Sequence, residues 1–254
     1  MAEPRHLEHA PITEALIDFR VKAWAGFRAE KFANLRGRLA ARFPKVEERR
    51  GLQATFGVIQ RKGQPPVMED LGLQGYFFKA SDEKTIAQFR VDGFTVNRLH
   101  PYTSWEKLFP EAMDLWRLYA SFSKPEVITR LAVRYINRIV LPPGAMLPLS
   151  TNLLRKYLEA APVIPPEVPQ SISGFLTRVT VHDPKTEINA HVAQALETNA
   201  PGQQLVVILD IDAFKQREFT IDDPAIEQTF VQLRAFKNLI FFNSLSDSIL
   251  EELG

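Results

Sequence analysis

Three arginines repeat at every fourth position of one long, mostly apolar segment. Arg130, Arg134 and Arg138 lie within EVITRLAVRYINRIVL, residues 126–141. A β-strand alternates its side chains between two faces and rises about 3.3 Å per residue, so successive arginines share one face about 13 Å apart. Guanidinium groups bind carboxylates and phosphates through paired hydrogen bonds. The spacing therefore predicts either an anion-binding strip or a row of internal ion pairs.

Two carboxylates repeat with the same spacing near the start of the chain. Residues 12–24, ITEALIDFRVKAW, alternate apolar and polar side chains as a strand does, with Glu14 and Asp18 on the polar side. If this strand lies beside the arginine segment, the carboxylates and guanidinium groups would face one another, with Arg20 included. Partly buried arginines usually have such partners. We therefore expect an internal charged seam, and an anion or phosphate site at the three arginines is the alternative.

A second pair of carboxylates offers metal chemistry. Asp210 and Asp212 occupy one side of the apolar segment LVVILDIDAF. Two carboxylates on one face can share a divalent cation such as Mg²⁺ or Mn²⁺, and a nearby histidine, His191, could add a ligand or a general base. No HExxH or similarly spaced ligand motif accompanies them. We expect a solvated sheet face without a cofactor, and a metal-dependent hydrolase or nuclease-like enzyme is the alternative.

Aromatic and basic residues gather around residues 90–116, a mixture that stacks bases in single-strand nucleic-acid binders. They are Phe94, His100, Tyr102, Trp105 and Trp116, with Arg90 and Arg98. The tryptophans also lie on the apolar stripe of an expected helix, which favours a core position. Lys and Arg number 31 against 30 Asp and Glu, so the net charge argues against nucleic acid without excluding a local patch.

The elements that must position these residues are mostly strands. We expect strands at residues 12–24, 52–60, 71–79, 85–91, 94–100, 126–141, 172–182, 187–197 and 204–214. Asp92-Gly93 favours a two-residue hairpin turn, and a second turn at residues 183–186 would place His191 opposite Arg178.

Helical periodicity predicts amphipathic helices at residues 29–43, 104–122 and 151–161, and a long helix after Pro224. The apolar stripe of that last helix includes one lysine, Lys237. The closing segment FKNLIFFNSLSDSILEEL carries more apolar side chains than one helix face needs, which indicates deep burial or, alternatively, a homodimer or protein-partner interface.

The pattern predicts an α+β protein of two antiparallel sheet units, each with covering helices, packed as one compact body. The first unit spans residues 1–142 in the order β-α-β-β-β-β-α-β, and the second spans 150–254 in the order α-β-β-β-α. Residues 143–149, within the proline-containing stretch LPPGAMLPL, form the expected linker.

Composition excludes several classes of protein. The chain has 254 residues, of which 45% are hydrophobic, and it has no cysteine, which excludes disulfides and thiol chemistry. GxGxxG, GxxxxGK[ST] and GxSxG are missing, so the usual signatures of dinucleotide, P-loop and α/β-hydrolase sites are missing as well. Without an apolar leader or membrane-spanning stretch, we expect a cytoplasmic protein with no membrane association.

Four segments together resemble the landmarks of a sporadically distributed bacterial protein family of about this length and of unassigned function. These segments are PITEALIDFRV, LAVRYINRIVLP, LVVILDIDAF and LRAFKNLIFFNSLSDSILEEL. The resemblance implies a bacterial protein that folds as one whole-chain unit, and it carries no catalytic residue onto this sequence. We therefore expect a non-enzymatic binding or assembly protein that acts through oligomeric or partner contacts, with the hydrolase and an anion sensor as alternatives.

Overall fold

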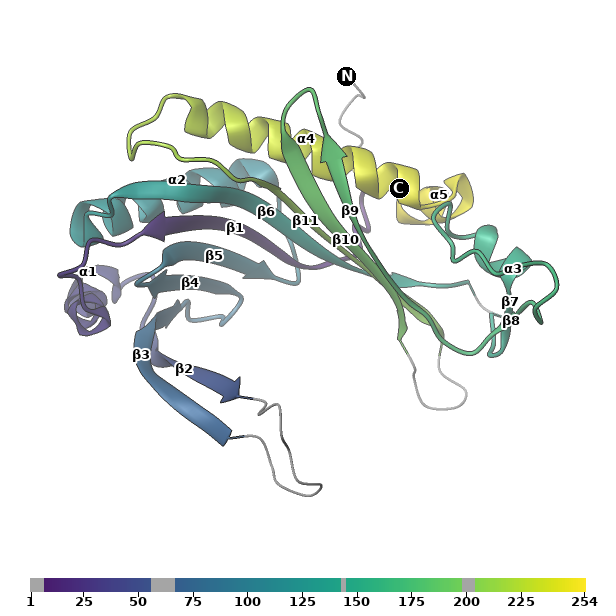
Figure 1. Cartoon of the computed structure of the whole chain (residues 1–254), viewed down its shortest axis with the longest axis horizontal. Coiled ribbons are helices and arrows are strands. Elements are labelled where there is room, and N and C mark those ends of the chain that lie inside the picture. Colours follow the sequence, from purple (N-terminus) through teal and green to yellow (C-terminus); the bar gives the residue numbers. More distant parts are fainter. Residues whose placement is uncertain (1–6, 56–66, 143–144, 198–203) are drawn as a thin grey trace.

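A computed structural model of the chain describes residues 7–55, 67–142, 145–197 and 204–254. The chain forms a long curved sheet with helices on one side (Figure 1). Its strands are β1 (Ile12–Lys22), β2 (Lys45–Thr55), β3 (Val67–Lys79), β4 (Thr85–Arg90), β5 (Gly93–Leu99), β6 (Val127–Val140), β7 (Leu149–Ser150), β8 (Ser171–Ile172), β9 (Leu176–Asp183), β10 (Ile188–Glu197) and β11 (Val206–Lys215). Its helices are the 3₁₀ helix η1 (Ala29–Leu35), α1 (Arg36–Leu39), α2 (Trp105–Ser123), α3 (Thr151–Arg155), α4 (Ala225–Ser244) and α5 (Asp247–Leu253).

The expectation of two separate sheet units is wrong. Nine strands form one antiparallel sheet in the order β2-β3-β4-β5-β1-β6-β11-β10-β9, and β7 and β8 make a small second sheet. Strand accounts for 41% of the structure and helix for 28%, so the protein is mostly β. The two expected units merge because β6, from the first, pairs along its length with β11, from the second. The linker residues 143–144 lie outside the described residues.

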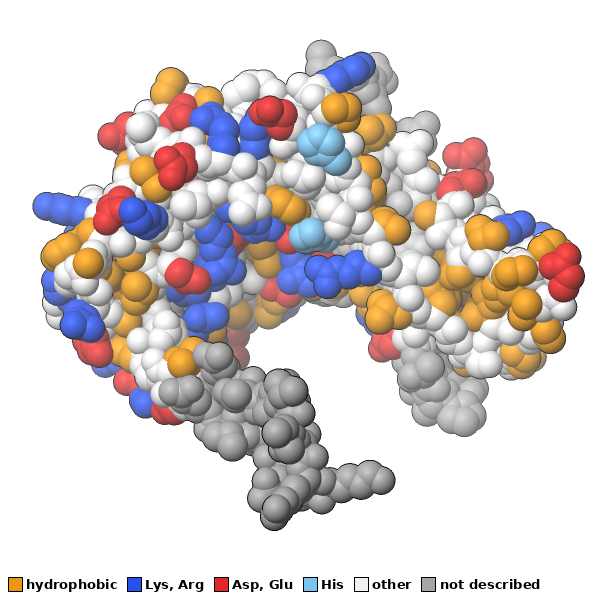
Figure 2. Space-filling model, in the orientation of Figure 1, with side chains coloured by type: hydrophobic (Ala, Val, Ile, Leu, Met, Phe, Trp, Pro, Cys, Tyr) orange, Lys and Arg blue, Asp and Glu red, His pale blue; other side chains and the backbone are white. Residues whose placement is uncertain are grey.

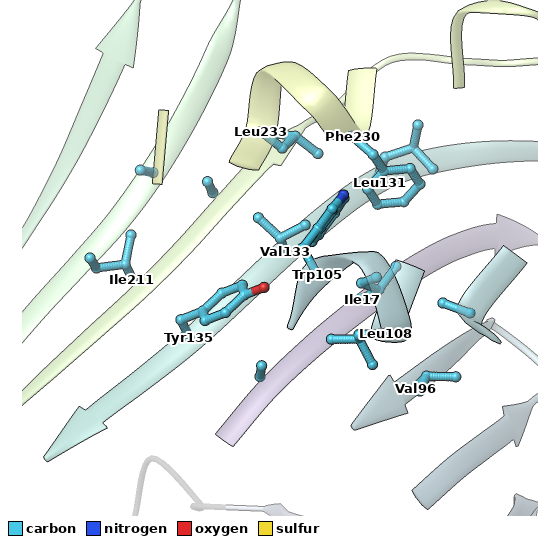
Figure 3. Packing of buried hydrophobic residues seen from close by; sticks show 14 of the residues in the cluster. Ile17, Val96, Trp105, Leu108, Leu131, Val133, Tyr135, Ile211, Phe230 and Leu233 are labelled. Atoms are coloured by element: carbon cyan, nitrogen blue, oxygen red, sulfur yellow. The ribbon is translucent and has the colours of Figure 1, made fainter. Parts of the chain in front are cut away.

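One face of the sheet carries the hydrophobic core. Alternate residues of β1 and β6 point to this face, among them Ile17, Phe19, Leu131 and Val133, all fully buried. Helices α2 and α4 pack against it, and Figure 3 shows side chains from both helices meeting those of the central strands. Phe19 stacks on Trp116 of α2 with ring centroids 4.1 Å apart. The period-two pattern in the strands and the helical stripes therefore specify the same core.

Helical elements near the N-terminus and after residue 150 are shorter than expected. Residues 29–43 form a 3₁₀ helix and one short α-helix, although the apolar stripe is buried as expected, with Phe32, Leu35 and Leu39 in the core. The expected helix at 151–161 ends at Arg155. Periodicity identifies the buried face in both cases, but it does not determine how many hydrogen-bonded turns the packing permits.

The first hairpin is present with a different turn. Arg90 pairs with Gly93, so Val91 and Asp92 form the two-residue loop and Gly93 begins β5. Gly93 is required by packing, because a Cβ at this position would lie 2.3 Å from the carbonyl oxygen of Phe19 on β1. The dipeptide signal located the hairpin, and contact with the neighbouring strand placed the glycine outside the loop.

The second hairpin is offset from the expected register. Glu187 has a left-handed φ of 57° and its N–H donates to the carbonyl of Asp183, so it belongs to the turn. Ile188 therefore pairs with Asp183, and His191 pairs with Thr180 instead of Arg178. The strand expected at 52–60 begins earlier, at Lys45, and residues 56–60 lie outside the described residues.

The aromatic residues considered for base stacking serve mostly as core. Phe94, Trp105 and Trp116 are at most 7% exposed. At the C-terminus, Phe241, Leu245, Ile249 and Leu250 are buried as the sequence favoured, whereas Val231 and Leu239 of α4 are about half exposed. Within the described parts of the chain, none of the helices combines the length and apolar composition needed to cross a lipid bilayer.

Candidate functional site

The polar face of the sheet lies opposite α2 and α4. Strands β1 and β6 are antiparallel neighbours, with Asp18 paired to Ala132, and the arginine row and the first-strand carboxylates occupy this common face. Figure 2 shows basic side chains, with acidic ones among them, along the upper margin of the hollow on the underside of the molecule. The adjacency expected from matched four-residue spacing is therefore present.

Asp18 is the centre of the charged seam. Its carboxylate is 5% exposed and accepts hydrogen bonds from Thr95 at 2.6 Å and from Arg90 at 3.0 Å. Arg20 and Arg130 also donate to it, at 3.2 and 3.3 Å. Three guanidinium groups from three strands thus converge on one buried carboxylate, and each of the three bonds is strengthened by charge.

The pKa of Asp18 reflects these contacts. Burial by itself would raise it, but the charges of Arg90 and Arg20 and the hydrogen bonds from Thr95 and Arg90 outweigh burial and hold the pKa below its ordinary value. Asp18 is consequently a permanent anion at neutral pH.

The rest of the arginine row is paired with the second half of the chain. Arg130 also donates to both oxygens of Asp212 at 2.8 Å, and Arg134 donates to the two oxygens of Asp210 at 2.8 and 2.6 Å. Arg138 reaches Glu197 of β10 at 3.1 Å. All three arginines thus have carboxylate partners within the sheet, as expected for an internal charged seam.

Glu14 lies on the arginine face and its charge acts on Arg134, but its hydrogen-bond partner belongs to the other neighbouring strand. It accepts a hydrogen bond from Asn97 of β5, which in turn accepts from Gln88 of β4 at 2.8 Å. The polar seam therefore crosses the sheet from β4 to β10, although its charge is concentrated between β1 and β11. Spacing identified Asp18 as a hydrogen-bonded partner of the arginines, whereas Glu14 acts on Arg134 through its charge and bonds to β5.

The proposed metal ligands Asp210, Asp212 and His191 are each engaged by another side chain. Both carboxylates of Asp210 and Asp212 accept bidentate arginine contacts, and His191 bonds through Nδ1 to the Thr180 hydroxyl at 2.9 Å. Among the described residues, no three or more acidic or histidine side chains are grouped so that they could hold a metal ion. A cation at the two aspartates would have to displace two arginines and would meet their positive charge.

Comparison with models of protein families and with curated proteins finds no match to this chain. Its function must therefore be inferred from its own residues.

Mg²⁺ or Mn²⁺ at millimolar concentration is expected to leave the melting temperature of the protein unchanged, because a ligand stabilises only if the folded state binds it. Differential scanning calorimetry with and without metal measures this. The Asp210→Ala, Asp212→Ala double variant serves as the control. A metal-dependent rise in the melting temperature of the wild type that disappears in the double variant would support the hydrolase hypothesis.

The open edge of β9 was not singled out in the sequence. Within the described residues β9 is the last strand of the sheet, paired on one side only, with β10. Leu176 is 75% exposed, Val179 55% and Val181 39%. Alternating β-branched residues predicted a strand here, but a strand at the edge and one in the centre share this pattern, so only the sheet order reveals the free edge.

Proposed function

We propose that this protein is a non-enzymatic binding and assembly protein that associates with a second copy of itself through the edge of β9. The observation that carries the proposal is an eight-residue free edge, LTRVTVHD, with exposed leucine and valine side chains and a single basic residue before its terminal His182 and Asp183. Such an edge presents unpaired backbone groups that another strand can complete.

The contrast with the opposite edge supports an associating role for β9. Strand β2 carries Lys45, Glu47, Glu48, Arg49 and Arg50. Several of these side chains form ion pairs with β3, as Glu47 does with Lys79 and Arg50 with Asp70. Lys45 pairs with Glu83 in the turn after β3. Charged side chains are a common means of blocking edge-to-edge pairing. One edge is therefore protected by charge, and the other is not.

A second copy suits this edge better than a strongly charged partner. Antiparallel pairing of β9 with itself, centred on Val179, would set the two Val179 side chains against each other and Arg178 against Thr180 of the second copy. No like charges would then lie directly opposite each other. The result would be a two-fold symmetric, continuous sheet that contains the nine strands of each copy.

Continuous strand pairing supports this arrangement, because β10 holds β9 in the sheet along most of its length. Arg138 of β6 is bonded to Glu197 of β10, and β10 pairs along almost its whole length with both β9 and β11. A strand edge held in a fixed shape loses less conformational freedom on pairing than a loop would.

Size-exclusion chromatography with light scattering is expected to show a concentration-dependent dimer. Val179→Lys is expected to raise the dissociation constant of the dimer about ten-fold or more, which corresponds to roughly 1.4 kcal/mol. Two lysines would then face each other across the paired strands. Sedimentation equilibrium on both proteins measures the constants.

Val231→Lys is the matched control, since Val231 is 51% exposed but lies on α4, away from β9. It should dimerise as the wild type does. A strict monomer at the highest soluble concentration, or equal weakening by both substitutions, would overturn the proposal. A monomer that binds an extended peptide through β9 would identify another protein as the partner instead of a second copy.

A further inference from the structure

A cavity of about 510 Å³ lies on the core side of the sheet, remote from the charged face. It is bounded by α4, by Tyr135 and Asn137 of β6, by the segment from His100 to Glu106 that leads into α2, and by residues 7–12. Its volume falls in the range of small-molecule sites, and Trp105, Phe241 and Phe242 provide much of its apolar wall.

Lys237 of α4 lines this cavity and is the unusual group in it. The side chain is 8% exposed, and its Nζ lies 3.9 Å from the centre of the Tyr135 ring. In the described part of the chain, no side chain or backbone group forms a hydrogen bond or an ion pair with this amine. A buried lysine without an anionic partner is costly to a fold, and a costly group in a cavity points to a role there.

Two carboxylates line the cavity, Glu8 and Glu106, and neither lies within ion-pairing distance of the Lys237 amine. Arg234, one turn earlier on α4, is a second cation, and Glu106 is occupied by an ion pair with Arg234 at 3.1 Å. Burial, with a smaller contribution from the charge of Arg234, lowers the pKa of Lys237 to about 7. The unprotonated amine, which is the nucleophile, is therefore far more populated at neutral pH than in an ordinary lysine.

Two tyrosine hydroxyls lie in the same cavity. Tyr102 and Tyr135 are hydrogen-bonded to each other at 3.0 Å, and the Tyr135 ring is the one beneath the Lys237 amine. Figure 3 shows Tyr135 projecting from β6 on the side of the sheet where Trp105 packs. Burial raises the pKa of both tyrosines, so they remain neutral hydroxyls that can donate a hydrogen bond to an oxygen atom of a ligand.

We propose that this cavity binds a small aldehyde or ketone with an apolar body and that Lys237 condenses with its carbonyl group. The Nζ lone pair adds to the carbonyl carbon, and the oxygen gains a proton to give a carbinolamine. Loss of that oxygen as water gives an imine. The amine supplies two hydrogens and the carbonyl supplies the oxygen of the water released, so no oxidant or reductant is required. The tyrosine pair supplies the donor for the carbonyl oxygen. This activity is independent of association through β9.

The test traps the imine in the native, full-length protein at pH 7. Benzaldehyde is the probe, sodium cyanoborohydride reduces any imine to a stable benzyl amine, and peptide mass spectrometry locates the adduct. Lys107, exposed on α2, is the internal control in the same sample. Lys237 is expected to be labelled at least about ten-fold faster than Lys107, because an ordinary lysine with a pKa near 10.4 is almost wholly protonated at pH 7.

Two further measurements separate a ligand site from a merely reactive lysine. The labelling rate of Lys237 should saturate with benzaldehyde concentration, and Tyr102→Phe should slow it several-fold without changing the labelling of Lys107. The proposal that Lys237 is an activated nucleophile is overturned if Lys237 is labelled no faster than Lys107 in the native protein. It is also overturned if Lys237 is labelled equally in native and urea-unfolded protein. A labelling rate of Lys237 that rises strictly linearly with benzaldehyde concentration overturns the proposal that the cavity binds the aldehyde. These comparisons use the wild type or an exposed reference, so they remain decisive even if a Lys237 variant fails to fold.

Discussion

Asp18→Ala is expected to lower the free energy of unfolding by about 3–5 kcal/mol, because it leaves the buried Arg90 without its one buried carboxylate partner. Arg90 is 4% exposed and donates to Asp18 at 3.0 Å. The other partners of Arg90, the Thr95 hydroxyl and the largely exposed Asp92, do not replace the lost buried charge. Urea unfolding followed by circular dichroism measures the loss.

Asp210→Ala provides the matched control, with the same chemical change in the same seam. Arg134, its partner, is 41% exposed and can turn to solvent, so the expected loss is at most about 1 kcal/mol. The Asp18→Ala, Arg90→Ala double variant should lose less than the sum of its single variants, because the second substitution removes the stranded charge. Equal losses for Asp18→Ala and Asp210→Ala would contradict the central role of Asp18.

The same carboxylate gives stability a dependence on acid. The folded pKa of Asp18 lies below its ordinary value of 3.8, so the unfolded chain takes up its proton first as the pH falls. The contribution of the ionised Asp18 to the free energy of unfolding is thus fully present above about pH 4, and it is lost as the pH falls through the pKa of Asp18 in the folded protein. The unfolding curves of wild type and Asp18→Ala should therefore converge in acid.

Lys237→Met is expected to stabilise the protein by about 3–5 kcal/mol at pH 7 and below. On folding, the Lys237 amine must either release its proton or be buried with its charge and without water, and methionine avoids both costs. The pKa of Lys237 falls from 10.5 in its ordinary state to about 7 in the folded protein. Methionine has a similar length and can keep the packing over Tyr135.

The pH dependence follows from the direction of this change. Between about pH 7 and pH 10.5 the unfolded chain binds more protons at this site than the folded chain, so wild-type stability should rise with pH across that window. The slope contributed by one such group is at most about 1.4 kcal/mol per pH unit. The other titratable side chains that line the cavity are unchanged in the variant, so the difference between the two proteins isolates Lys237. They are Glu8, His9, His100, Tyr102, Glu106, Tyr135 and Arg234.

Urea unfolding of wild type and Lys237→Met at several pH values between 6 and 10 measures the difference. It should be largest near pH 6 and shrink steadily above pH 7. Lys107→Met, at an exposed position, should show a small difference that does not change with pH. Parallel curves for the wild type and Lys237→Met would mean that the amine keeps its proton in the folded protein.

Much of the charged face could be predicted because its signal is local. The period of a strand fixes which side chains share a face, so the spacing of Arg130, Arg134 and Arg138 placed them together. The partner strand carrying Asp18 was identified by the same periodicity. The helical stripe of α4, including Lys237, is likewise a local pattern, and it is buried as the periodicity indicated.

The sheet order was not predictable by the same reasoning. Asp210 and Glu197 become partners of the arginine row only because β11 lies beside β6 and β10 lies beside β11. The sequence separates Arg134 from Asp210 by 76 residues. The proline-containing connection after Val140 was interpreted as a boundary between two units. After this connection the chain adds β9, β10 and β11 to the same sheet, and periodicity within a segment does not show which other segment it pairs with.

By itself, therefore, the sequence determined the local facts: which segments are strands, which side chains share a face, and that three arginines needed partners. The tertiary structure alone decided that Asp210, Asp212 and Glu197 also neutralise them. It alone decided that, among the described residues, β9 has an open edge and no carboxylate pairs with Lys237. The physical reason is that face and period arise from the geometry of one strand or helix. Partners, edges and unpaired buried groups arise from the packing of elements that lie far apart in the chain.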